Sequence, residues 1–268
     1  MMIDSYLVCT MTTNTISFLS LSIIFVLCCA FARSEKGQLN IVFIGDSITQ
    51  ANGIGENNRP PTAAASYLMT ALGWKNVQFN NQGRSGFTTV DFLPATKKAF
   101  PDVLKAADSF SNKPGSLVFS IMLGTNDSAI KGPNGSPVSK ENYRANLKAI
   151  GDSLLLRYPD SRIVFQGPLW YSDSTRNSSS YLVEGRERLQ SYLPQILSLV
   201  KAYKKTHPER VFFGDRSGYG YFKKNHLTDM KTETGPNGRF YLHPNDKGAE
   251  ALGILWAKAI AKVIRQGN

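Results

Sequence analysis

The chain has 268 residues, of which 42% are hydrophobic, and a formal net charge of +11. This length is sufficient for a folded domain with a substantial core. Its three cysteines are Cys9, Cys28 and Cys29, so residues 33–268 have no disulfides, thiolate metal sites or cysteine nucleophile. Because Lys and Arg are scattered, with no run longer than two, we interpret the positive charge as a solvated surface and expect no nucleic-acid partner.

The first 32 residues are typical of an export signal. An apolar run from Ile16 to Phe31 ends in Ala30-Phe31-Ala32, a small-x-small cleavage pattern. We therefore expect cleavage after Ala32, a mature domain of residues 33–268, and a periplasmic or extracellular protein with no stable membrane insertion. Initiation at Met11 and a retained membrane anchor are the alternatives, but the run has 16 residues and a span needs about 20.

Beyond the leader, short apolar runs alternate with longer amphipathic ones, which predicts one α/β domain with a parallel sheet. The expected strands are Leu39–Ile44, Val77–Asn80, Ser116–Leu123, Arg162–Gln166 and Val211–Phe213. The expected helices are Thr62–Leu72, Val90–Phe110 with interruptions at Pro94 and Pro101, Lys140–Tyr158, Leu182–Lys205 with a kink at Pro194, and Asn245–Arg265. The remaining long segment, Gly214–Leu242, reads as an irregular functional loop.

The first expected strand ends abruptly at Gly45-Asp46-Ser47. In open parallel sheets the ligand crevice lies outside the carboxyl ends of the strands, which places Ser47 at this crevice. Asp46 or Ser47 acting only as a helix cap is the alternative interpretation.

Two further strand ends carry polar or glycine residues. The second strand runs into Asn81–Gly86, and the third is followed by Gly124–Asp127, which includes Asn126. A histidine, His243, stands just before the last helix. Acyl transfer needs a serine, a base and preorganised donors for an oxyanion, and the backbone N–H groups of Ser47 and Gly86 with the Asn126 amide would be those donors.

Each of these residues also has a simpler interpretation. Asn126 would serve as a turn residue, and Gly86 as a steric requirement of its loop. His207 and His226 are lesser candidates for the base. Two aromatic residues, Trp170 and Tyr171, either line the substrate cleft or pack against the domain edge.

Taken together, four sequence blocks resemble the SGNH/GDSL hydrolase family of esterases and acetylesterases. The blocks are Gly45-Asp46-Ser47-Ile48-Thr49, Asn81-Gln82-Gly83-Arg84-Ser85-Gly86, Gly124-Thr125-Asn126-Asp127 and His243-Pro244-Asn245. The resemblance implies a flavodoxin-like three-layer sandwich with a central parallel sheet of about five strands. It also implies Ser47 as nucleophile, Gly86 and Asn126 in the oxyanion hole, His243 as base, and neither a cofactor nor a metal.

One position departs from the family pattern. The family usually has an aspartate three residues before the histidine, and here that position is Phe240. An imidazole base needs an acceptor for its other N–H. The candidates are the backbone carbonyl of Phe240, the side chain of Asp229 and, as a weaker option, Glu233. We expect a Ser47–His243 dyad with the carbonyl as acceptor.

The resulting functional hypothesis is a secreted esterase that removes O-acetyl groups from carbohydrates through a Ser-His acyl-enzyme mechanism. The basic surface suits acidic sugars such as sialic acid, and the expected partner is an acetylated glycan or another small ester. A lipid or thioester acylhydrolase is one alternative. A non-catalytic glycan-binding module is the other, and the intact Ser47 and His243 argue against it.

Overall fold

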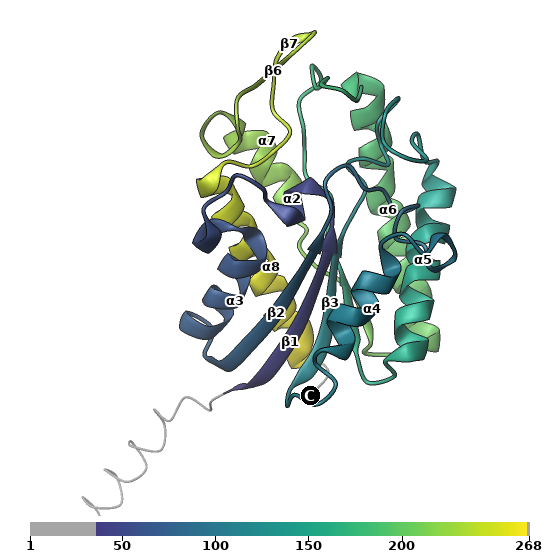
Figure 1. Ribbon diagram of the computed structural model, residues 1–268, viewed down its shortest axis with the longest axis vertical. Helices are drawn as coiled ribbons and strands as arrows, with labels where there is room; N and C mark the ends of the chain where they lie inside the picture. The colour runs from purple at the N-terminus through teal and green to yellow at the C-terminus, as the bar shows by residue number, and fades with distance from the viewer. Residues whose placement is uncertain (1–35, 267–268) are drawn as a thin grey trace, which may run out of the picture. The chain divides into compact units, whose positions relative to one another are not determined.

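A computed structural model describes residues 36–266, so the expected signal peptide and its cleavage point lie outside the described residues. A five-stranded parallel sheet with the order β2-β1-β3-β4-β5 forms the centre of the domain (Figure 1). The strands are β1 (Lys36–Gly45), β2 (Trp74–Gly83), β3 (Ser116–Met122), β4 (Arg162–Phe165) and β5 (Val211–Phe213). The predicted α/β fold with a flavodoxin-like strand order is confirmed.

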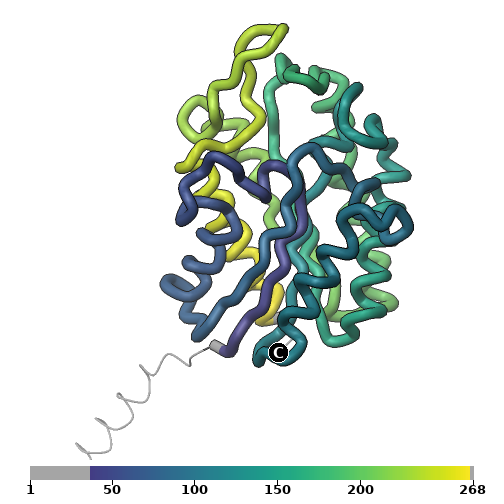
Figure 2. The backbone as a smooth tube through the Cα atoms, viewed as in Figure 1, coloured from purple at the N-terminus to yellow at the C-terminus, as the bar shows by residue number. Residues whose placement is uncertain are grey.

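Helices cover both faces of the sheet, α3 and α8 on one side and α4, α5 and α6 on the other (Figures 1 and 2). The helices are α2 (Ser47–Gln50), α3 (Pro60–Thr70), α4 (Phe100–Asp108), α5 (Lys140–Arg157), α6 (Leu182–Thr206), α7 (Gly218–Asp229) and α8 (Asp246–Gln266), with short 3₁₀ helices η1 (Glu56–Asn58) and η2 (Pro94–Thr96). Within residues 36–266, no helix is both long enough and apolar enough to cross a bilayer.

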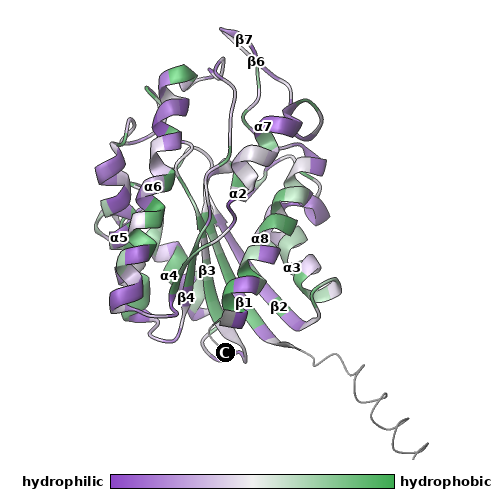
Figure 3. Ribbon diagram, turned by 180° about the vertical axis from the view of Figure 1, so that it is seen from behind, coloured by the Kyte–Doolittle hydropathy of each residue, from purple (hydrophilic) through white to green (hydrophobic). Residues whose placement is uncertain are grey.

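Strand β1 is buried on both faces because its side chains alternate between two cores. Ile41 and Phe43 belong to the cluster under α3 and α8, whereas Val42 and Ile44 belong to the cluster under α4, α5 and α6. The ring of Phe43 stacks on Trp256 of α8, with centroids 5.6 Å apart. Seen from behind, the central strands β1 and β3 and the inward sides of the helices are mostly hydrophobic, whereas the outward sides of the helices are polar (Figure 3). Packing on both faces therefore holds β1 in place, and with it the residues that follow its carboxyl end.

One expected helix differs from the structure. The segment Val90–Phe110 is not one interrupted helix, because Pro94 begins η2 and Pro101 lies in the first turn of α4. Proline is tolerated there since the first N–H groups of a helix have no intrahelical acceptor. The long helix expected at Leu182–Lys205 is present as α6, which continues through Pro194.

The expected irregular loop at 214–242 is largely regular, so that prediction is wrong. It contains helix α7 and a β-hairpin made of β6 (Glu233–Gly235) and β7 (Gly238–Phe240). Helix α7 has no clear amphipathic pattern in its sequence, and two glycines lie in its first turn. A helix of this kind forms because neighbouring elements pack on it, here α8, and not because of its own propensity.

The strand order places the ends of three strands side by side. Strand β1 pairs with β2 on one side and β3 on the other, and Gly45 lies opposite Gly83 and Met122. In a sheet of this order the ligand crevice forms between β1 and β3, where the strand order reverses. The residues that follow these strands are thus candidates for one site.

Candidate active site

Ser47 is the first residue of α2, directly after β1. Asp46 caps this short helix, and its side chain accepts a hydrogen bond from the Ile48 N–H at 2.9 Å. Gly45 is required by close packing, because a Cβ there would lie 2.0 Å from the Thr49 hydroxyl oxygen. Asp46 is therefore the N-cap of α2, and this cap holds the neighbouring Ser47 at the end of β1.

Two carboxylates beneath the strand ends are fully buried. Burial raises the pKa of Asp46 to about 6, against the opposing effects of the Ile48 N–H bond and the charge of His243. Burial likewise raises the pKa of Asp127 to about 7, although hydrogen bonds from Thr89 favour its charged form. Asp127 accepts the Thr89 N–H at 3.0 and 3.1 Å, which ties the loop after β2 to the loop after β3.

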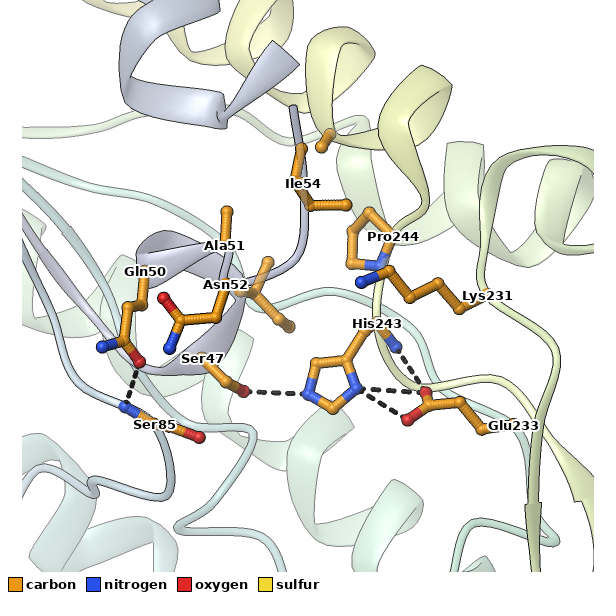
Figure 4. Close-up of a pocket in the computed structure, with 12 residues that line it drawn as sticks. Ser47, Gln50, Ala51, Asn52, Ile54, Ser85, Lys231, Glu233, His243 and Pro244 are labelled. Carbon is orange, nitrogen blue, oxygen red and sulfur yellow. Dashed lines mark hydrogen bonds and ion pairs between the residues drawn. The ribbon is translucent and has the colours of Figure 1, made fainter. Parts of the chain in front are cut away.

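His243 stands between Ser47 and a glutamate. Its Nε2 atom lies 2.9 Å from the Ser47 Oγ atom, and its Nδ1 atom lies 3.0 Å from both carboxylate oxygens of Glu233 (Figure 4). The Glu233 carboxylate also accepts the backbone N–H of His243 at 3.2 Å. With Nδ1–H donating to Glu233, the Nε2 lone pair faces the serine hydroxyl, the arrangement of a serine, base and acid chain.

The expected Ser47–His243 dyad with a carbonyl acceptor is therefore wrong. Glu233, ranked last among the three candidates, is the acceptor, whereas the Asp229 carboxylate binds Lys247 at 2.7 Å and also Tyr221. Burial alone would raise the pKa of Glu233, but hydrogen bonds from His243 and the charge of its ring hold that pKa below its usual value. Glu233 is thus ionised at neutral pH.

The hairpin explains how Glu233 replaces the missing aspartate. Glu233 pairs with Phe240 across the β6–β7 ladder, so the carboxylate comes from the strand opposite the position where the family carries it. The hairpin continues to Lys231, whose N–H donates to the His243 carbonyl at 2.8 Å. One residue separates Lys231 from Glu233, but two separate Phe240 from His243.

This extra residue acts as a β-bulge, which re-aims side chains next to it. Residues opposite each other in an antiparallel pair share a face, as do residues two apart along a strand. Lys231, Glu233 and His243 consequently face the same side, toward Ser47 (Figure 4). Gly235 of the hairpin is required by close packing, because a Cβ there would lie 1.8 Å from the Arg176 carbonyl oxygen.

Gly86 and Asn126 lie on loops linked to Ser47. The Asn126 side-chain amide donates to the Phe87 carbonyl at 3.0 Å, and its oxygen accepts from the Tyr181 hydroxyl at 2.7 Å. These bonds orient the amide and leave it one free N–H. Gly86 has φ +76°, the left-handed region, and its Cβ position is open.

A hydrogen bond also joins the Gly86 loop to α2. The Ser85 N–H donates to the Gln50 side-chain oxygen at 2.9 Å. Within residues 36–266, the backbone N–H groups of Ser47 and Gly86 donate to no protein acceptor. The three loops that the sequence singled out are therefore contiguous, with three N–H donors available.

A pocket of about 210 Å³ opens beside Ser47. Small apolar side chains form part of its wall, and polar ones the rest (Figure 4). The lining residues are Ser47, Ile48, Gln50, Ala51, Asn52, Ile54, Ser85, Lys231, Glu233, His243, Pro244 and Ala249. Gly86 and Asn126 do not line this pocket.

The other sequence candidates lie elsewhere. Tyr171 is buried, with its hydroxyl 2.9 Å from that of Ser128. Trp170 packs on the ring of His226 at 5.1 Å, and His207 contacts the neighbouring Thr206. The described part of the chain contains no group of three or more His, Cys, Asp or Glu side chains able to hold a metal ion.

Comparisons with known proteins bear on the family and the fold. The sequence matches the model of the GDSL-like lipase/acylhydrolase family over residues 43–251. No curated protein matches it. Solved structures of similar fold include Est24, a carbohydrate acetylesterase from Sinorhizobium meliloti, with TM-score 0.57 and 17% identity over 84% of this chain and 99% of that one.

A second is an aryl esterase of M. smegmatis, with TM-score 0.57 and 15% identity over 84% of this chain and 99% of that one. A third is a family 3 carbohydrate esterase of Clostridium thermocellum, with TM-score 0.58 and 16% identity over 85% of this chain and 98% of that one. At these identities the structural matches establish the fold alone. The family match spans most of the chain and includes the Ser47 and His243 blocks. The chain therefore belongs to the GDSL-like lipase/acylhydrolase family and is a carboxylic ester hydrolase.

Proposed function

We propose that this protein is an exported carbohydrate esterase that removes acetyl groups from sugar hydroxyls. The observation that carries the proposal is the hydrogen-bonded chain from Ser47 through His243 to Glu233. Two of the structural neighbours are described as carbohydrate esterases, which supports the substrate class. Acidic sugars such as sialic acid are the finer expectation, since the surface is basic. Export rests on the leader sequence.

In the proposed mechanism His243 takes the Ser47 proton at Nε2 as the Oγ atom attacks the acyl carbonyl carbon. Glu233 holds the ring in position and stabilises the imidazolium. The negative charge that develops on the carbonyl oxygen is received by the N–H groups of Ser47, Gly86 and Asn126. When the tetrahedral intermediate collapses, His243 gives the proton to the departing sugar oxygen, which leaves as a hydroxyl. A water molecule, deprotonated by His243, then attacks the acyl-enzyme and releases the acid and the free Ser47.

Replacing Asn126 with alanine should lower kcat by about 10²–10³ with a smaller change in KM, because one oxyanion donor is lost. Steady-state kinetics on 4-nitrophenyl acetate, with melting temperature as a check on folding, measures this. Tyr181→Phe is the matched control, since it removes only the hydroxyl that orients the amide, and it should lower kcat less. A higher KM with an unchanged kcat would make Asn126 a ground-state binding residue.

Acyl-chain preference tests the substrate class. We expect kcat/KM on 4-nitrophenyl esters to fall steeply from acetate to octanoate. The polar loop at 167–180 suggested this from the sequence, but none of its residues lines the pocket. The structural reason is instead the pocket wall of Ala51, Ile54 and Ala249, which form a small buried cluster of their own, in a space of about 210 Å³.

A preference for octanoate would favour the second candidate, a lipid or thioester acylhydrolase, which the family name also includes. An acetyl-release assay over sialylated glycans, xylan and pectin would then identify the alcohol. Acetyl release from none of them, together with octanoate preference, would overturn the carbohydrate assignment while leaving the ester hydrolase intact.

A further inference from the structure

One side chain in the pocket has no part in the proposed mechanism. Among the described residues that line the pocket, Lys231 is the single lysine or arginine. Its backbone N–H donates to the His243 carbonyl at 2.8 Å, so its position is tied to that of the base. A Cβ on Gly53 would lie 3.8 Å from the Lys231 Nζ atom. The ammonium group therefore reaches from the hairpin across to the loop that follows α2 (Figure 4).

The Lys231 ammonium forms no ion pair or side-chain hydrogen bond within the part of the chain that the structure describes. The neighbouring carboxylates are engaged elsewhere. Glu233 accepts both N–H groups of His243. Asp246 accepts the Gly55 N–H at 2.8 Å, and this bond, followed by the one from Asn58 and then by the charge of Lys231, lowers the pKa of Asp246.

Lys231 is half-buried, and an ammonium group without a direct ion-pair partner is available to an anionic ligand. The lysine ammonium is a compact charge with three N–H donors. It can bind a carboxylate without the fixed bidentate geometry that an arginine guanidinium imposes. The side-chain amides of Gln50 and Asn52, which line the same pocket (Figure 4), add neutral polar groups. The pocket thus has one positive end and lies directly beside the Ser47 hydroxyl.

We propose that Lys231 binds a carboxylate of the substrate and so selects anionic esters over neutral ones. This inference rests on the proposed ester hydrolysis at Ser47 and adds the substrate's charge to it. The carboxylate belongs either to the alcohol part, as in an O-acetylated acidic sugar, or to the acyl part, as in a dicarboxylic half-ester. The chemistry at Lys231 is the same in both cases.

Two matched substrate pairs distinguish these sources. For the alcohol part the pair is 3-acetoxybenzoate and its neutral amide, 3-acetoxybenzamide. For the acyl part the pair is the phenyl half-ester of succinic acid and the phenyl methyl diester. The measured quantity is the ratio of kcat/KM for the anionic ester to kcat/KM for its neutral partner, because a ratio cancels general effects on catalysis or folding.

In Lys231→Gln we expect this ratio to fall about tenfold in one pair, the size of a lost charge-assisted hydrogen bond, and the affected pair identifies the source. Lys231→Arg should keep most of the ratio. The matched control is Lys247→Gln, which removes a nearby lysine that pairs with Asp229 at 2.7 Å and does not line the pocket. It should leave both ratios unchanged.

Ratios that are unchanged in Lys231→Gln for both pairs, in an enzyme that hydrolyses the neutral esters, would overturn the inference and leave the proposed function standing. An equal fall in Lys247→Gln would also overturn it, since the effect would then come from overall charge. If the wild-type protein hydrolyses none of the four esters, the proposed function itself fails.

Discussion

Replacing Ser47 with alanine is expected to reduce kcat for ester hydrolysis by about 10⁶, to the background of the assay. The hydroxyl is the atom that forms the acyl bond, and no other described side chain lies at that position. The fold should persist, because Ser47 is half-buried and its hydroxyl makes one hydrogen bond, to His243, worth about 1 kcal/mol. The measurement is turnover of 4-nitrophenyl acetate by purified protein.

Circular dichroism and the melting temperature of Ser47→Ala provide the control for folding. A correctly folded variant that hydrolyses 4-nitrophenyl acetate near the wild-type rate would contradict the serine mechanism. A variant that fails to fold would be replaced by Ser47→Cys, which retains a side chain of similar size and should also lose most of the activity toward esters.

Replacing Glu233 with glutamine is expected to lower kcat by about 10³–10⁴, the effect of neutralising the acid in a serine triad. Glutamine keeps the shape of the side chain but removes the charge that stabilises the His243 imidazolium. This expectation reverses the one that follows from the sequence, where a carbonyl acceptor would leave Glu233 dispensable. Steady-state kinetics on acetate esters measures it, and KM should change much less than kcat.

Two variants serve as controls for Glu233. Glu233→Asp keeps the charge on a shorter side chain and should recover part of kcat. Asp229→Asn changes a carboxylate on the same segment that binds Lys247 and Tyr221 and should keep most of kcat, even if the protein becomes less stable. A large loss in Asp229→Asn with near-normal kcat in Glu233→Gln would contradict the assignment of the acid.

Much of the fold follows from local sequence. Most strands were predictable because they are short apolar runs ended by glycine or polar residues, as at Gly45, the last residue of β1, and at Gly124 shortly after β3. The proximity of Ser47 to the loops of Gly86 and Asn126 also followed, since neighbouring parallel strands end at the same edge. The hydrogen bonds that join these loops, such as the one from the Thr89 N–H to Asp127, could not be predicted from the sequence blocks.

The acid was missed because it depends on pairing between strands. Glu233 reaches His243 only when 233–235 and 238–240 form a hairpin with a bulge beyond it, and strands of three residues give almost no periodic signal. The signal that did exist was Gly235-Pro236-Asn237-Gly238, a turn sequence between two short extended runs. Reading it as a hairpin turn would have placed Glu233 opposite Phe240.

The central claim is that ester hydrolysis proceeds through Ser47, activated by His243 and Glu233. The most direct test treats the protein with a fluorophosphonate, which phosphonylates only an activated serine, and follows the mass of the intact chain and of its peptides. The account predicts one label per molecule, on Ser47, with labelling much slower in Glu233→Gln. A label on another residue, or no label in a protein that hydrolyses esters, would contradict it.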